Sequence, residues 1–167
     1  MMKFNIDYSH KDKIHVIGNK AHVSIVTIDD SRNPAKWIPL IFDTGAFITI
    51  INKDFANANG YQVYQPKACI IAGFSEKGMV CDLRKIPTVV FCGFRINNVL
   101  IATPHEDDVP VADVLGMNII ENFNVGLNFT EEEIYISIRD NFISQKPKYR
   151  CGDVSVFNDV TEKGRQT

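Results

Sequence analysis

The chain has little net charge and no long apolar run, and both absences limit what it can be. Its 167 residues carry 18 basic and 20 acidic side chains, a formal net charge of −2. Domains that bind nucleic acid or anionic membrane surfaces usually have an excess of positive charge. No apolar run approaches the length of a membrane-spanning helix, and the first residues, MMKFNIDYSHKDK, lack the apolar core of a signal peptide. We therefore expect a protein that binds neither nucleic acid nor a membrane.

The four cysteines form no metal-binding or disulfide pattern. No Cys-x-x-Cys pair is present, so the sequence favours neither a zinc site nor a disulfide framework. His10, His15 and His22 are spaced irregularly and are more typical of solvated or core histidines than of a metal site. The acidic run over residues 105–108 could bind a cation, but a solvated loop is the more common outcome. We expect no metal, no other cofactor, and a reduced, cytoplasmic setting.

Composition and patterning favour one mostly β domain. A chain of this length with 45% hydrophobic residues can bury a real core, and nothing requires a second domain. Apolar and polar residues alternate with a period of two along much of the chain, as in half-buried strands. From Ser144 onward the sequence is polar, with few apolar anchors. We expect a single domain over residues 1–143 and a loosely attached polar tail over residues 144–167.

Local signals place a short helix and a hairpin. Asn52 can cap a helix over residues 54–59, which Gly60 would end. The clearest hairpin comes later, around a turn of acidic residues that includes Glu131. Its expected cross-strand pairs are Val125 with Ile138, Leu127 with Ile136, and Phe129 with Ile134.

One acidic residue lies between two strongly apolar segments. Residues 38–42 (IPLIF) predict a buried strand, residues 46–51 (AFITII) predict another, and Asp43-Thr44-Gly45 joins them. An ionised carboxylate is costly in such surroundings unless it is hydrogen-bonded, paired or protonated. Asp-Thr-Gly also occurs in ordinary surface turns, because Asp and Gly are turn residues. Catalysis is one common reason to hold a carboxylate here, and a second motif is needed to choose between these interpretations.

The second motif lies well downstream. The segment Val114-Leu115-Gly116 is followed by Asn118, a good N-cap for a short helix over residues 119–123. By itself this segment is simply a strand that leads into a helix. In this order and at this separation, however, the two motifs resemble those of the retropepsin-like aspartic proteases, the retroviral protease superfamily. The resemblance covers about residues 20–140.

The resemblance implies a mostly β fold, a closed β-barrel equivalent to half of an acid protease, with one or two short helices. It also implies a flap, which is a β-hairpin that closes over an extended peptide. Residues 67–85 fit this demand, because apolar stretches flank a polar tip that contains glycine, although an ordinary structural hairpin would look the same. A hairpin centred near its tip would place Cys69 opposite Cys81. The expected tip residues are Gly73, Phe74 and Ser75.

A single Asp-Thr-Gly supplies only one of the two carboxylates that this chemistry needs. In carboxylate-catalysed peptide hydrolysis, one Asp takes a proton from water while the other, protonated, polarises the scissile carbonyl. One copy per chain can complete the pair only if two chains associate about a two-fold axis beside Asp43. The resemblance therefore implies a homodimer that cleaves an extended peptide or protein substrate, with Asp43 as the catalytic residue.

By the same resemblance, the neighbours of Asp43 support its loop. Thr44 would form a hydrogen bond across the two-fold axis, and Gly45 would let the backbone approach closely. Ala46 stands where larger relatives of the family often have Ser. The segment Val114-Leu115-Gly116 would pack beneath the loop and shape it. A catalytically inert peptide-binding or scaffold module of the same fold is the alternative function.

Overall fold

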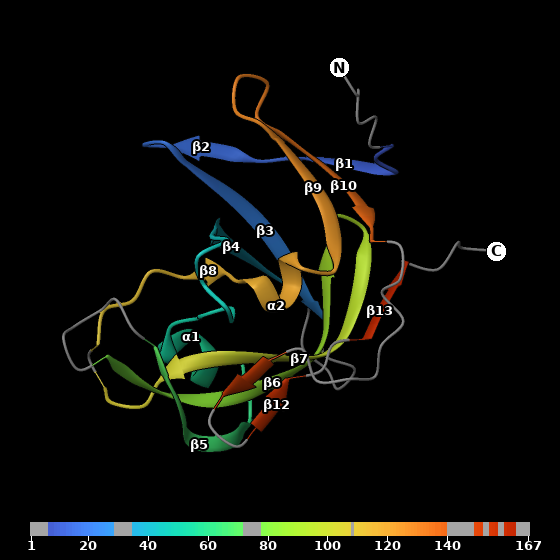
Figure 1. Cartoon of the computed structure of the whole chain (residues 1–167). Coiled ribbons are helices and arrows are strands. Elements are labelled where there is room, and N and C mark those ends of the chain that lie inside the picture. The colour runs from blue at the N-terminus through green and yellow to red at the C-terminus, as the bar shows by residue number, and fades with distance from the viewer. Residues whose placement is uncertain are drawn as a thin grey trace.

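The computed structural model describes residues 7–28, 35–71, 78–107 and 109–139, and the backbone of three short strands between residues 149 and 162. The described chain is mostly β, as expected, with two short helices (Figure 1). Its elements are β1 (His10–Lys13), β2 (His15–Ile17), β3 (Lys20–Ile28), β4 (Lys36–Phe42), α1 (Lys53–Ala58), β5 (Val63–Ile71), β6 (Met79–Phe91), β7 (Phe94–Pro104), β8 (Val114–Leu115), α2 (Met117–Ile120), β9 (Phe123–Asn128), β10 (Glu133–Ile138), β11 (Tyr149–Cys151), β12 (Val154–Val156) and β13 (Asp159–Glu162).

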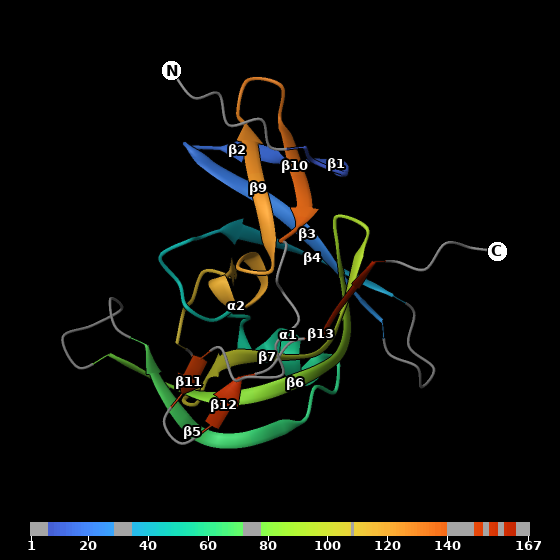
Figure 2. The same ribbon diagram turned by 45° about the vertical axis from the view of Figure 1, so that its right-hand side comes forward.

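The larger sheet is built around the long hairpin of β6 and β7. Its strand order is β13-β7-β6-β3-β4-β8, with β2 attached to β3 and β5 attached to β6. The turn between β6 and β7 contains only Cys92 and Gly93, both in the left-handed region (φ 47° and 86°), which suits a tight two-residue hairpin turn. The hairpin bends so that this turn lies beside the smaller sheet (Figure 2), where Phe91 and Phe94 stack against Phe123.

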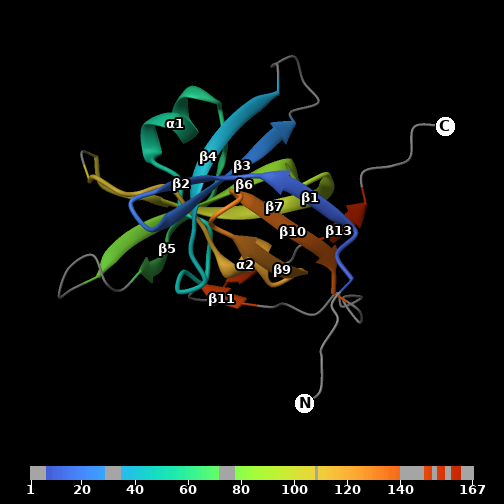
Figure 3. The same ribbon diagram turned by 90° about the horizontal axis from the view of Figure 1, so that it is seen from above.

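The smaller sheet has the order β1-β10-β9, and α2 lies next to β9 (Figure 3). The predicted hairpin is present, but its predicted register is wrong by two residues, since Ile134 pairs with Leu127 and Ile136 with Val125. The reason is a tight turn in which Glu132 adopts φ 52° and the Asn128 side chain accepts a hydrogen bond from Glu131 N at 3.0 Å. Because the shift is even, the same side chains still share one face.

The first helix follows its sequence signals, and the second does not. Asn52 caps α1, where its side chain accepts a hydrogen bond from Phe55 N at 2.8 Å, and Gly60 follows the helix with φ 69°. The helix expected after Asn118 begins earlier, at Met117. Asn118 is therefore inside α2 and is not its N-cap. Its side chain bonds instead to Thr49, which is distant in the sequence.

Three further expectations concern the overall architecture. In the part of the chain that the structure describes, none of the three sheets, which include the two-stranded pair β11-β12, closes on itself, so a closed barrel remains a prediction. The boundary between a domain over residues 1–143 and a loose tail also remains a prediction, although β13 pairs with β7 and β11 with β12. Among the described residues, no helix is long and apolar enough to cross a membrane.

Candidate active site

The loop that carries Asp43 starts where β4 meets β8. These two strands are parallel, with Ile41 beside Val114 and Phe42 beside Leu115. Just past the end of β4, Asp43 N donates a hydrogen bond to Leu115 O at 3.1 Å. The second sequence motif therefore fixes the point at which the chain leaves the sheet and Asp43 begins its turn.

After the turn, the chain returns along the other side of the same motif. Ile50 and Val114 exchange two backbone hydrogen bonds of 3.0 Å, while Ala46 O accepts a bond from Met117 N at 2.7 Å. The second strand predicted for residues 46–51 is therefore wrong, because the backbone groups of this segment bind several different neighbours and form only isolated bridges at Ile50. The structure thus brings the two motifs together and holds β8 between the two arms of the Asp43 loop.

Gly116 and Asn118 make this close packing possible. A side-chain carbon on Gly116 would lie 2.3 Å from Ile48 C and 2.4 Å from Ile48 O, so only glycine fits there. The buried Asn118 carboxamide accepts hydrogen bonds from Thr49 N at 2.8 Å and Thr49 Oγ1 at 2.9 Å, and it donates to Leu100 O at 2.9 Å. One side chain thus ties the returning arm of the loop to β7.

Asp43 is half-buried at the edge of the molecule. Its Oδ1 accepts a hydrogen bond from Gly45 N at 2.8 Å, and its backbone carbonyl accepts one from Ala46 N at 3.3 Å. A side-chain carbon on Gly45 would lie 3.1 Å from Asp43 Oδ1, closer than most such contacts. Thr44 and Gly45 are exposed, so the expected deep burial of the carboxylate is not found within one chain. The tip of the loop is open to an approaching molecule.

Asp43 opens onto an apolar cleft of about 300 Å³. Two lining residues, Ile70 and Ile71, come from the end of β5, directly before the hairpin tip. The other lining residues come from the Asp43 loop and from β8: Gly45, Ala46, Phe47, Ile48, Ile50 and Val114. A single carboxylate, that of Asp43, therefore lines a cleft whose other side chains are apolar.

The β5–β6 hairpin reaches this cleft, as a flap would. Its predicted centring is confirmed, since Cys69 pairs with Cys81, and both are buried, reduced thiols. The expected tip residues Gly73, Phe74 and Ser75 lie outside the described residues. The flap function of the hairpin therefore remains a prediction.

Comparison with solved structures supports the fold. The chain is similar to a structure titled as a retropepsin-like aspartic protease from Rickettsia conorii, with a TM-score of 0.55 and 15% sequence identity. The match covers 81% of this chain and 96% of that chain. The fold is retropepsin-like. No protein-family model and no curated protein matches the sequence.

Within this retropepsin-like fold, sequence reasoning missed Asp113. Its carboxylate accepts hydrogen bonds from Asn52 N at 2.8 Å and Asn52 Nδ2 at 3.1 Å, which ties the start of β8 to the cap of α1. Burial raises the pKa of the Asp113 carboxyl, although the bonds from Asn52 oppose this shift. No local pattern indicates this contact, because Asn52 and Asp113 belong to segments that meet only in the folded chain.

The residues considered as metal ligands are scattered over the retropepsin-like fold. His15 pairs with His22 across β2 and β3, whereas His10 stacks on Phe94 with ring centroids 4.4 Å apart. His105 lies beside Asp82 at the far end of β7. Over the described residues, no group of three or more His, Cys, Asp and Glu side chains is arranged to hold a metal ion.

Proposed function

We propose that this chain is an aspartic-type endopeptidase that works as a homodimer. The observation that carries the proposal is Asp43, which is held by Gly45 N–H and lines an apolar cleft to which the β5–β6 hairpin contributes Ile70 and Ile71. A carboxylate beside an extended apolar cleft suits the hydrolysis of a peptide bond within a bound chain. The retropepsin-like fold is consistent with this chemistry.

Two copies of Asp43 would share the reaction. One ionised carboxylate would take a proton from a water molecule placed between the two, and the water oxygen would attack the scissile carbonyl. The other, protonated carboxyl would donate a hydrogen bond to that carbonyl as negative charge develops on its oxygen. Two carboxylates held close together cannot both ionise, so the pair would titrate as a unit.

The surface around Asp43 has features that favour self-association. Thr44 is exposed beside a shallow concave face of about 590 Å³, whose apolar side chains include Phe42, Met117, Val125 and Leu127. An axis that brings two Asp43 side chains together must pass next to Thr44, so the partner would cover this face. Burial of these side chains would help to stabilise the dimer.

The first experiment compares cleavage of a peptide library by the wild type and by Asp43→Asn, from about pH 4 to 7. The variant should lose about 10²- to 10⁴-fold in rate, because it cannot act as the base. The control is Asp54→Asn, an exposed carboxylate in the first turn of α1, which should cleave like the wild type. Cleavage that survives in Asp43→Asn would rule out this mechanism.

A mixing experiment tests the shared site. An excess of Asp43→Asn added to wild type should inhibit cleavage, because mixed dimers contain only one catalytic carboxylate. Undiminished activity, together with a monomeric mass by analytical ultracentrifugation under assay conditions, would contradict the dimer. Peptide binding without cleavage by the wild type would favour the inert module. The cytoplasmic setting expected from the sequence remains a prediction.

A further inference from the structure

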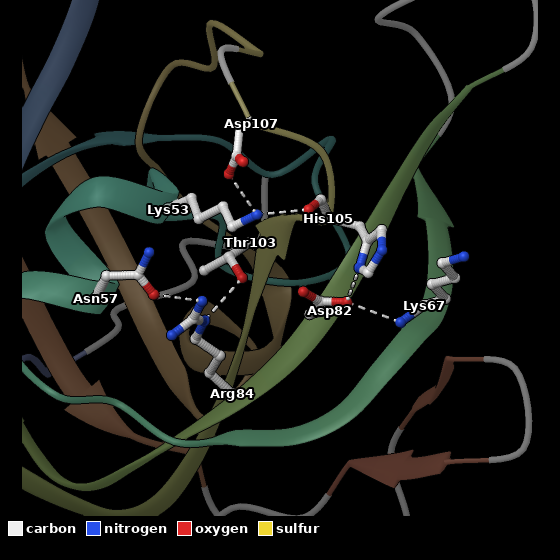
Figure 4. Close-up of polar contacts among 8 residues, drawn as sticks. All are labelled: Lys53, Asn57, Lys67, Asp82, Arg84, Thr103, His105 and Asp107. Carbon is white, nitrogen blue, oxygen red and sulfur yellow. Dashed lines mark hydrogen bonds and ion pairs between the residues drawn. The ribbon is translucent and has the colours of Figure 1, made fainter.

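A buried carboxylate joins the two arms of the β5–β6 hairpin to the chain that follows β7. Asp82 on β6 is only 5% exposed. Its Oδ1 accepts a hydrogen bond from Lys67 N at 2.8 Å and lies 2.7 Å from His105 Nδ1 (Figure 4). Because a carboxylate only accepts, the imidazole carries a proton on Nδ1. We call Lys67, Asp82 and His105 the hairpin clasp.

The clasp lies where the β5–β6 ladder is irregular. The register of β5 shifts between Gln65 and Cys69, and Lys67 adopts φ 49° within this bulge. A bulge leaves a backbone N–H without its ladder partner, and Asp82 provides the acceptor. Beyond the bulge the pairing is regular again, up to Ile71 opposite Met79. The bulge therefore separates the regular outer part of the hairpin from the rest of the ladder.

His105 connects this point to the rest of the molecule. Its backbone N donates to Val80 O at 2.9 Å, and its carbonyl accepts a bond from Lys53 Nζ at 2.6 Å. Lys53 belongs to α1 and also pairs with Asp107 at 2.7 Å. The His105 side chain is 35% exposed, whereas that of Asp82 is 7% exposed. The clasp thus attaches the hairpin to α1 at a position that water can reach.

The two segments that the clasp joins, the β5–β6 hairpin and α1, both connect to residues of the cleft. Ile70 and Ile71, which line the cleft, lie on β5 between the clasp and the hairpin tip. On the other side, the cap of α1 bonds to Asp113, which directly precedes the cleft residue Val114. The clasp therefore connects β5, which contributes Ile70 and Ile71 to the cleft, to α1, whose cap bonds to the residue before Val114.

We propose that His105, acting through Asp82, is a positioning residue that sets the angle of the hairpin over the Asp43 cleft. Its effect on cleavage rests on the proposed function, while its effect on the hairpin does not. A simpler role for Asp82 would be to balance the buried Arg84, which bonds to Thr103 Oγ1, Tyr61 O and Asn57 Oδ1. Charge balance alone would not require the imidazole, so removal of His105 separates the two roles.

The test measures amide hydrogen exchange and peptide cleavage in the full chain. His105→Ala should speed exchange in β5 and the outer part of β6 about tenfold or more, the size expected from losing a hydrogen bond to a charged group. It should raise KM by about tenfold with little change in kcat, because a misplaced hairpin weakens substrate and transition state alike. His105→Asn should restore both, since its amide can occupy the place of Nδ1. The matched control is Asp107→Asn, which removes the exposed pair with Lys53 and leaves the clasp intact.

The exchange and cleavage results separate the clasp from general destabilisation and from the proposed function. Exchange in His105→Ala that rises equally in β9 and β10 would mean general destabilisation and would overturn the proposal, as would unchanged exchange in the hairpin. If His105→Ala does not fold, His105→Gln replaces it, because its amide reaches the place of Nε2 and not that of Nδ1, and the same loosened hairpin is expected. A wild type that cleaves no peptide refutes the proposed function only, and exchange then decides the clasp alone.

Discussion

Asn118→Ala removes the side chain that holds the returning arm of the Asp43 loop. In the wild type, the Asn118 carboxamide accepts hydrogen bonds from the backbone N–H and hydroxyl of Thr49 and donates one to Leu100 O. Thr49 is 0% exposed and Leu100 is 6% exposed. The alanine variant would therefore leave a buried N–H and a buried carbonyl without these partners and out of reach of water.

The size of the effect follows from these lost partners. A buried donor or acceptor left unsatisfied costs about 1–3 kcal/mol, so the two groups together should lower the free energy of unfolding by about 2–6 kcal/mol. This is a large part of the stability of an ordinary domain, which is about 5–15 kcal/mol. Cleavage should fall as well, because Thr49 lies between Ile48 and Ile50, which line the cleft.

Urea unfolding followed by circular dichroism measures this loss. The matched control is Asn122→Ala, a buried residue just after α2 whose side-chain amide donates hydrogen bonds to two carbonyls of that helix, Asn118 O and Ile119 O. It should cost less, about 1–3 kcal/mol, because one buried carbonyl, Asn118 O, loses this bond while Ile119 O keeps the bond from Asn122 N. If Asn118→Ala proves no less stable than Asn122→Ala, the network with Thr49 does not hold the loop.

Two further predictions concern the same region. Gly116→Ala should lower the free energy of unfolding by about 3 kcal/mol, because its added carbon would meet the backbone of Ile48 at 2.3 Å. Thermal denaturation measures this loss, and a stability equal to that of the wild type would contradict the packing. Burial raises the pKa of Asp113 above its ordinary value of 3.8, so the folded chain holds this proton more tightly than the unfolded chain does. The wild type therefore loses stability as the pH rises from about 3.8 through the raised pKa of the folded state. Asp113→Asn should not show this loss. If the difference in unfolding free energy between the variant and the wild type stays constant with pH, the prediction is refuted.

Local signals in the sequence were sufficient where neighbours along the chain determine the outcome. The cap at Asn52 depends on a hydrogen bond to Phe55 in the same turn, and the pairing of Cys69 with Cys81 follows from the centre of one hairpin. The register of the β9–β10 hairpin was missed, although it is also local. The turn, which contains the left-handed residue Glu132, lies one residue earlier in the chain than predicted, and the acidic composition did not indicate its position.

The sequence by itself determined the mostly β fold and the two motifs whose pairing indicates a retropepsin-like chain, because apolar periodicity and turn residues act over a few positions. Only the tertiary structure decided the partners of the buried polar groups. Residues 46–51 are not a strand because β7, β8 and α2 share their hydrogen bonds. The Asn118 amide, expected to cap a helix, bonds instead to Thr49. Asp82 bonds to His105 because β6 brings its carboxylate to the end of β7. A buried polar group takes whatever partner the folded chain places beside it, and no local pattern encodes that choice.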